Sequence, residues 1–307
     1  MDIDSPDAER WIAMVGYYRL SGYWYPFRQP NSDPEALERR LSEFIPGTHF
    51  STVQALYEFD RKLRSLVHDG IERIEIALRS QLGYLLGSRD PRAHLFAENF
   101  PPKPNRSKTN HIQWLNAFTG RVARAPKSNE VIRHHVDRYR GQIPIWAALD
   151  FADFKDVSQL YELLVLDDQV TVAEELGVPL GVERMSSAQR SSLTTTGHPL
   201  SRWFEQLSVM RNIAAHHGRL WNRGMVPAQT SFLRAADLTT LPEGQSERVY
   251  GALTLMAHLL ESTSPGTSWP RKLANLVTDD FPAVDGRSVE EMGFLAGWHD
   301  SRPWDRP

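Results

Sequence analysis

A run of regularly spaced apolar residues between Ser51 and Gly87 constrains the fold of this chain more than any other feature. Its apolar side chains recur every three or four residues: Val53, Leu56, Phe59, Leu63, Leu66, Val67, Ile71, Ile74, Leu78, Leu82 and Leu85. That spacing puts them on one face of an α-helix. Ser51 suits an N-cap, and Gly87, followed by Pro91, suits a helix end. The sequence therefore predicts a long amphipathic helix over 51–87, with a bend at Gly70.

Shorter helical patterns cover much of the remaining chain. They predict helices at 111–125, 130–139, 156–166, 169–176, 199–217, 247–261 and 288–298. The last begins with Ser288-Val289-Glu290-Glu291, a capping-box pattern. Strand patterns are scarce, with short β pairing expected near 16–27. Pro-rich breaks at 100–104 and 225–245 are too short to separate two folded halves. The fold class predicted is all-α, as a single domain over 1–307.

Composition excludes several classes of function. The chain has no cysteine, which excludes disulfides, thiolate nucleophiles and Cys-ligated zinc. It shows no metal-ligand spacing, no P-loop and no H-E-x-x-H motif, so we expect no metal and no cofactor. A run of 18 apolar residues is missing and the N-terminus is acidic, so we expect no membrane span, no signal peptide and a cytoplasmic location. The net charge is −3, so nucleic-acid binding would need a local basic patch.

Two stretches of the chain are locally basic. The first, 121–140, has six bases and two acids, and includes Arg133 and Arg138. The second, 202–223, contains Arg202, Arg211, Arg219 and Arg223 against a single acid, Glu205. Such stretches are most often solvated helix faces. Arg133, Arg138, Arg202 and Arg223 are nevertheless candidate RNA contacts, and the second stretch also contains the most suggestive chemistry in the chain.

That chemistry belongs to the predicted helix 199–217, which begins with Pro199, a residue suited to the first helical position. One face of this helix is apolar: Leu200, Trp203, Leu207, Met210 and Ala214. Arg211 falls at the edge of this face, while Asn212 and His216, four residues apart, share another. A guanidinium at the edge of a core needs an acidic partner. The long helix offers three candidates, Asp60, Glu72 and Glu75.

Arg211, Asn212 and His216 together supply the groups that metal-free RNA cleavage requires. Arginine binds phosphate, asparagine can orient the histidine or the phosphate, and histidine exchanges protons near neutral pH. Cleavage needs a base for the ribose 2′-hydroxyl, an acid for the leaving 5′-oxygen, and cations for the phosphate charge. A single histidine cannot readily serve as both base and acid, so a second copy of the site would help. The adjacent His217 is equally available, and spacing alone does not distinguish these histidines from surface residues.

The string Arg211-Asn212-Ile213-Ala214-Ala215-His216-His217-Gly218-Arg219-Leu220-Trp221-Asn222-Arg223 resembles the signature of the Abi family of abortive-infection, phage-resistance proteins, of the AbiD and AbiF types. The resemblance extends along the chain. It includes Gly16-Tyr17-Tyr18-Arg19-Leu20-Ser21-Gly22-Tyr23-Trp24-Tyr25-Pro26-Phe27, the long-helix segments 59–64 and 71–79, the element 143–150, and Met292-Gly293-Phe294 with Trp298 and Trp304. One departure is Asp150, where the family pattern suggests glutamate. Another is the short chain before Gly16, which puts the first element of the fold in doubt.

The resemblance implies membership of the HEPN superfamily, helical domains in which an Arg, four to six residues and a His form a ribonuclease motif. Arg211, Asn212 and His216 would then be catalytic. The same family blocks make His217, Arg219, Asp60, Glu75 and Arg79 possible supporting residues. It further implies a homodimer, in which two motifs face one another across a composite site. The activity implied is a metal-independent endoribonuclease that cuts RNA during phage infection.

Two other classes of function remain open from the sequence. The first is an RNA-binding HEPN module without turnover, restrained by a small regulatory RNA or a partner protein. The intact Arg-Asn-x-x-x-His motif argues against it. The second is a nucleotidyl-transfer or metal-hydrolase enzyme, which has no supporting motif here.

Overall fold

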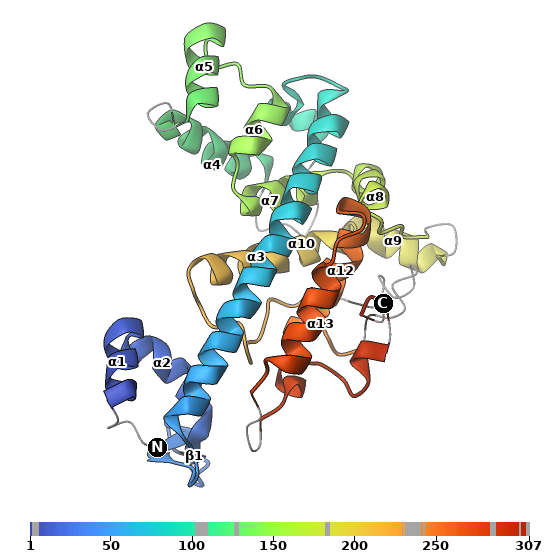
Figure 1. Cartoon of the computed structure of the whole chain (residues 1–307). Coiled ribbons are helices and arrows are strands. Elements are labelled where there is room, and N and C mark those ends of the chain that lie inside the picture. Colours follow the sequence, from blue (N-terminus) through green and yellow to red (C-terminus); the bar gives the residue numbers. More distant parts are fainter. Residues whose placement is uncertain are drawn as a thin grey trace.

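The computed structural model of the chain describes residues 1, 6–101, 110–125, 129–181, 185–228, 230, 241, 243–282, 287–300 and 302–304. The described part is mainly α-helical, which confirms the predicted fold class, and its only sheet has two strands (Figure 1). The predicted break at 100–104 lies outside the described residues from 102 onward, and the break at 225–245 lies partly outside them.

A single long helix, α3 (Phe50–Gly87), forms the axis of the structure. Its 38 residues extend about 57 Å at 1.5 Å per residue. The helix begins at Phe50, after His49, so the N-cap predicted at Ser51 was wrong, and the helix continues without interruption through Gly70. A Cβ at Gly70 would lie 2.7 Å from the Met256 side chain and 2.8 Å from that of Trp269. The glycine therefore allows close packing of neighbouring helices.

Most of the other helices pack against α3, whereas α4 packs against α7 and α5 against α6 (Figure 1). In chain order they are α4 (His111–Arg124), α5 (Glu130–Tyr139), α6 (Ile145–Phe151), α7 (Phe154–Leu163), α8 (Leu166–Glu175), α9 (Ser187–Thr196), α10 (Leu200–Ala215), α12 (Val249–Thr263) and α13 (Trp269–Asp279). The predicted helices that correspond to α4, α5, α7, α8, α10 and α12 are confirmed within a few residues. The predictions missed α6, α9 and α13. α10 packs against both α3 and α7, which places the motif helix against the centre of the long helix.

The segment before α3 folds differently from the prediction. Residues 16–27 are helical, in α2 (Tyr17–Trp24) and a 3-10 turn (Tyr25–Phe27), and α1 (Pro6–Val15) precedes them. Their buried residues follow helical spacing: Leu20, Tyr23, Trp24 and Phe27. The β pairing comes next, where β1 (Arg28–Pro30) pairs antiparallel with β2 (Arg40–Phe44). The pairing predicted at 16–27 was therefore wrong, because the aromatic side chains are buried at helical rather than alternating spacing.

The predicted helix at 288–298 was also wrong. This segment contains two short 3-10 turns, Val289–Met292 and Trp298–Asp300. Gly293 stands between them at φ 98°, in the left-handed region, with no room for a Cβ beside Gln245. A left-handed residue ends an α-helix, and here it directs Met292 and Phe294 into the core. The capping-box pattern does not function as a cap, because Ser288 makes no side-chain capping bond.

The buried side chains form one large apolar cluster around α3, α10 and α12, and a small one of Leu180, Met185 and Leu193. Trp203 and Trp221 are fully buried in the large cluster. Within the ranges described above, no helix combines the length and the apolar character needed to cross a membrane.

Candidate functional site

The motif occupies the C-terminal end of α10, and the backbone there has a defined geometry. His216 is the C-cap of the helix, and His217 follows at φ 56° in the left-handed conformation. The amide of Gly218 donates to the Ile213 carbonyl at 2.8 Å, and that of His217 donates to Ala214 at 3.1 Å. These two bonds form the left-handed helix end that glycine normally occupies at this position. The chain therefore holds a histidine where a glycine would be less strained.

The three predicted catalytic residues lie on the outer side of this helix end. Asn212 and His216 are exposed, and Arg211 is half-buried at the edge of the apolar face, as its spacing predicted. The guanidinium of Arg211 donates to the side-chain oxygen of Asn212 at 3.3 Å. Leu207, Met210 and Ala214 on the other face are buried against the core. The core contacts therefore fix the helix and leave the motif open to a ligand.

The acidic neighbour of Arg211 is Glu75 on α3. Burial raises the pKa of the Glu75 carboxyl, and the positive charges of Arg79 and Arg211 counteract that rise in part. The Glu75 side chain is 11% exposed and pairs with Arg79 one helical turn later. Of the three acids that the sequence offered to Arg211, Glu75 is the one whose charge interacts with it, whereas Glu72 is exposed.

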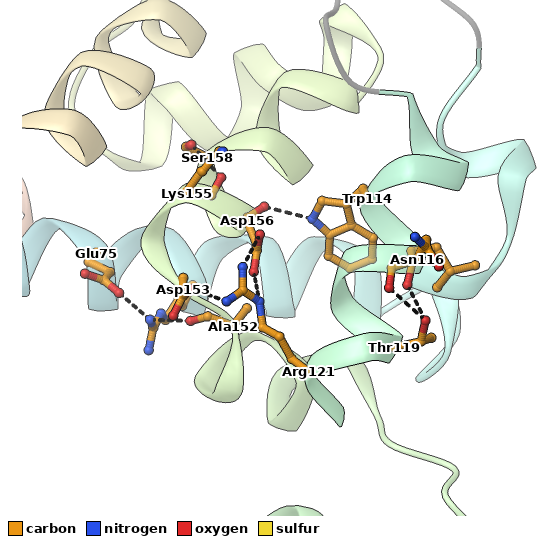
Figure 2. A network of polar contacts seen from close by, with 12 residues as sticks. Glu75, Trp114, Asn116, Thr119, Arg121, Ala152, Asp153, Lys155, Asp156 and Ser158 are labelled. Atoms are coloured by element: carbon orange, nitrogen blue, oxygen red, sulfur yellow. Dashed lines mark hydrogen bonds and ion pairs between the residues drawn. The ribbon is translucent and has the colours of Figure 1, made fainter. Parts of the chain in front are cut away.

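A network of polar contacts connects Glu75 to the neighbouring helices (Figure 2). Arg79 also donates to the carbonyl of Asp150, at 3.3 Å, in the last turn of α6, and to that of Ala152, at 2.8 Å, just after this helix; the segment from Asp150 to Asp153 is called here the Asp150–Asp153 turn. Arg121 of α4 pairs with Asp153 and, at 2.8 Å, with Asp156. These contacts hold the Asp150–Asp153 turn in place beside Glu75. The i,i+4 pair expected for Glu75 and Arg79 is present, and it is largely buried rather than a surface pair.

Asp60 does not pair with Arg211. It binds the backbone of the segment that follows the motif. Its carboxylate accepts hydrogen bonds from the Trp221 amide at 2.7 Å, from the Leu220 amide at 3.2 Å, and from the Tyr23 hydroxyl at 2.6 Å. It also pairs with Arg64 at 2.5 Å, and its side chain is completely buried. Although each of these partners lowers the pKa of Asp60, burial raises it more.

The end of the motif string is also tied to both terminal regions of the chain. Arg219 donates to the Gly22 carbonyl, and its guanidinium lies over the Trp221 ring, 5.9 Å from the ring centre. Asn222 donates to Glu291 at 2.7 Å, and Glu291 pairs with Arg287 at 3.0 Å. The segments that carry the sequence resemblance thus meet around the turn that follows His217.

A pocket opens beside the helix end, between α1, α2, α3 and the last residues of α10. It has a volume of about 790 Å³ and is lined by Met14, Val15, Arg19, Tyr57, Arg61, Arg64, Ser65, His68, Ala214, Ala215 and His217. Arg19 donates to the His217 carbonyl. Neither Arg19 nor His68 was predicted as a site residue. Arg19 lies in the segment 16–27 that resembles the family, so the resemblance could have indicated it. His68 lies outside the segments that carry the resemblance, and nothing in the sequence pointed to it.

The predicted RNA contacts lie in several places. Arg202 pairs with Glu205 at 2.6 Å on α10, and Arg223 is exposed in the chain after the motif. Arg133 and Arg138 are exposed on α5, which packs against α6 at the upper end of the molecule in Figure 1. In the part of the chain that the structure describes, no group of three or more His, Asp or Glu residues is arranged to hold a metal ion.

Comparison with known families agrees with the motif segments. A family model described as Abi-like protein matches residues 10–222, which extend from α1 to the end of the motif string. This chain belongs to the Abi-like family. The match includes α3, α10 and every pocket-lining residue. No curated protein and no solved structure matches the chain significantly.

Proposed function

We propose that this Abi-like protein is a metal-independent endoribonuclease that acts in the cytoplasm as an effector of abortive infection. One observation carries the proposal: Arg211, Asn212 and His216 lie together at an exposed helix end whose opposite face is anchored in the core. Family membership supports the role in abortive infection.

The chemistry assigns one task to each side chain. His216 takes the proton of the ribose 2′-hydroxyl or gives a proton to the departing 5′-oxygen. Arg211 binds the scissile phosphate and stabilises the charge that develops on it, and Asn212 orients the phosphate or His216. A bond forms between the 2′-oxygen and phosphorus while the bond from phosphorus to the 5′-oxygen breaks. The products are a 2′,3′-cyclic phosphate and a 5′-hydroxyl.

Glu75 acts on this site as a positioning residue. Its charge interacts with that of Arg211, and its ion pair with Arg79, which also donates to the Ala152 carbonyl, fixes its place. A guanidinium held in this way keeps part of its N–H surface directed toward solvent for a phosphate. His216 itself stays exposed for proton exchange.

The active species proposed is a two-fold symmetric homodimer. The reaction needs an acid and a base, and each motif supplies one favoured histidine. An isologous interface would bring the same helix end of each copy to the symmetry axis. The basic residues of the two copies would then line a common groove for RNA, and binding should weaken steeply with salt.

Cleavage assays in excess EDTA test the chemistry. The wild-type protein should cut RNA, leave DNA intact and produce 2′,3′-cyclic phosphate ends, because the 2′-hydroxyl is the nucleophile. His134→Ala, which removes an exposed histidine of α5, should cut like wild type. Loss of cutting on chelation, restored by Mg²⁺ or Mn²⁺, would refute the metal-independent chemistry. RNA binding by the wild type without any cutting would instead favour the non-catalytic module.

Mixing experiments test the shared site. An excess of His216→Ala chains mixed with wild type gives mostly mixed dimers. A composite site predicts that these lose most activity, whereas independent sites would keep half of it. A protein that is monomeric by light scattering and still cuts RNA would contradict the homodimer.

A further inference from the structure

The lining of the pocket beside the end of α10 combines two chemically different sets of side chains. We call Met14, Val15, Tyr57, Ala214 and Ala215 its apolar wall, and Arg19, Arg61, Arg64, His68 and His217 its cationic wall, although Tyr57, Arg61 and His68 share one face of α3. None of its lining residues, all within the described ranges, is an acid. Its volume of about 790 Å³ falls within the range of about 300–1,000 Å³ that is typical of small-molecule sites.

Several contacts fix these walls in place. Tyr57 packs edge-on against Trp11 and Tyr23, with ring centres 5.8 and 5.3 Å away. The Arg64 guanidinium lies 5.7 Å from the centre of the Tyr57 ring while its terminal nitrogen binds Asp60. The Arg19 guanidinium is held by the His217 carbonyl. The buried Arg64–Asp60 pair and the packing of Tyr57 thus fix one part of the lining, whereas Met14, Arg19 and His217 are exposed around it.

Two side chains on α3 that can donate to a phosphate, a guanidinium and an imidazole, remain accessible to a ligand. Arg61 is 51% exposed and donates through Nε to Glu58 at 2.8 Å, which occupies one of its five N–H groups. His68 is exposed two turns further along the same helix. Both line the cationic wall, at a spacing of seven residues that keeps them on one helix face.

The pocket is directly beside the motif. Ala215 and His217, the residues before and after His216, both line it. An RNA strand whose scissile phosphate lies at His216 therefore has a neighbouring nucleotide within reach of this pocket. A nucleotide has one flat apolar part and one anionic part, which match the two walls.

We propose that this pocket binds one nucleotide of the RNA strand next to the scissile phosphate, with the base on the apolar wall and the phosphate on the cationic wall. This inference rests on the proposed ribonuclease function. It assigns Arg61 and His68 to phosphate binding and makes the apolar wall a determinant of which base lies beside the cut.

Binding of short fluorescent 2′-O-methyl oligoribonucleotides, which lack the attacking hydroxyl, tests the pocket by anisotropy. The double variant Arg61→Ala/His68→Ala should bind about tenfold more weakly. Its slope of log affinity against log salt should become shallower by about 0.7 for each phosphate that the variant no longer neutralises. Lys62→Ala is the matched control, because Lys62 neighbours Arg61, is similarly exposed and forms a 2.8 Å ion pair, but with Asp280. If the double variant melts early, Arg61→Gln alone replaces it.

Small competitors identify the part of the ligand that the pocket recognises. Nucleoside 5′-monophosphates should displace the oligonucleotide better than ribose 5-phosphate or inorganic phosphate, and should slow cleavage only by competition. A monophosphate that changes the cleavage rate without displacing the strand would overturn the assignment in favour of a free-nucleotide effector site. Equal competition by ribose 5-phosphate would overturn the role of the apolar wall.

Cleavage patterns on mixed-sequence RNA separate this inference from the proposed function. The double variant should raise KM and weaken the base preference at one position beside the cut, because a strand whose phosphate is no longer anchored holds its base less firmly against the apolar residues. Wild-type binding and an unchanged pattern in the double variant would overturn the pocket while leaving the ribonuclease intact. A third outcome is that the wild type never cuts RNA but the double variant still binds RNA more weakly than the wild type. That result would support the pocket and refute the ribonuclease.

Discussion

Two acid–arginine pairs of the same spacing on α3 differ in what surrounds them. Asp60, paired with Arg64, accepts further bonds from Tyr23 and from two amides of the chain after the motif. Glu75, paired with Arg79, has the charge of Arg211 beside it and lies next to the open helix end. Burial raises the pKa of both carboxyls.

The difference between the pairs separates a structural task from a functional one. The Asp60 carboxylate holds three segments together, namely α2, α3 and the turn at Leu220 and Trp221. Glu75 pairs with Arg79 on α3, and its charge interacts with that of Arg211 on α10, a predicted catalytic residue. We therefore expect loss of Asp60 to affect folding and loss of Glu75 to affect activity.

The largest expected effect is on stability, from Asp60→Ala. The substitution leaves Arg64 and two buried amides without their acceptor, so the free energy of unfolding should fall by about 3–5 kcal/mol. Asp69→Ala is the control, because Asp69 forms an i,i+4 pair with Arg73 on the same helix but is 41% exposed. It should cost about 1 kcal/mol or less. Equal urea midpoints for the two variants would contradict the structural role of Asp60.

The next effect is on activity, from Glu75→Gln. Loss of the charge that interacts with Arg211 should reduce kcat/KM by about tenfold, which corresponds to about 1.4 kcal/mol of transition-state stabilisation. Glu72→Gln, an exposed change on the same helix, is the control and should cut RNA normally. A Glu75→Gln protein with full activity would remove Glu75 from the site.

A smaller effect concerns the pH dependence of stability. Because burial raises the pKa of Glu75, the folded protein binds a proton at this group more strongly than the unfolded chain does. Wild-type stability therefore falls as the pH rises from the unfolded value of about 4.3 toward the raised folded value. Glutamine does not titrate, so the Glu75→Gln protein does not undergo this fall in stability. Its unfolding free energy, relative to wild type, should be higher at about pH 7 than at about pH 4. A constant difference across urea titrations would contradict the raised pKa.

The smallest effect is expected from His217→Gly. Glycine adopts the left-handed conformation of His217 without strain, so the variant should be about as stable as wild type or more stable by about 1 kcal/mol. His217→Ala, which keeps a Cβ at this position, should be the less stable of the two in thermal melts. A large loss of stability in His217→Gly would show that the histidine side chain supports the turn.

Periodicity was sufficient to predict the elements with regular apolar spacing. The apolar stripe of α3 and the patterns of α10 and α12 gave their positions within a few residues. The predictions missed α13, α6, which has seven residues, and α9, whose sequence SAQRSSLTTT contains a single large apolar residue. At Gly293 a single left-handed residue ends the segment despite the capping-box pattern before it, and at Gly70 the glycine allows close packing against Met256 and Trp269. Both outcomes depend on neighbours distant in sequence.

The candidate site was predictable in part for the same reason. Spacing placed Arg211 at the core edge and Asn212 with His216 on the exposed face, because these relations lie within one helix. Which of the three acids Asp60, Glu72 and Glu75 lies near Arg211 depends on how α10 crosses α3. A local sequence pattern does not determine that crossing. His68 enters the pocket through that same crossing, and the left-handed backbone of His217 follows from the chain reversal that Asp60 anchors.

A comparison of RNA cleavage by His216→Ala and His217→Gly tests the central claim most directly. Both variants remove one histidine from the same turn, and the glycine spares the backbone at the position where alanine would be strained. Single-turnover assays in EDTA, with thermal melts of both proteins, should show cleavage abolished in His216→Ala and retained in His217→Gly. Retained cleavage in His216→Ala with loss in His217→Gly would move the catalytic role to His217, and full activity in both would contradict the ribonuclease site.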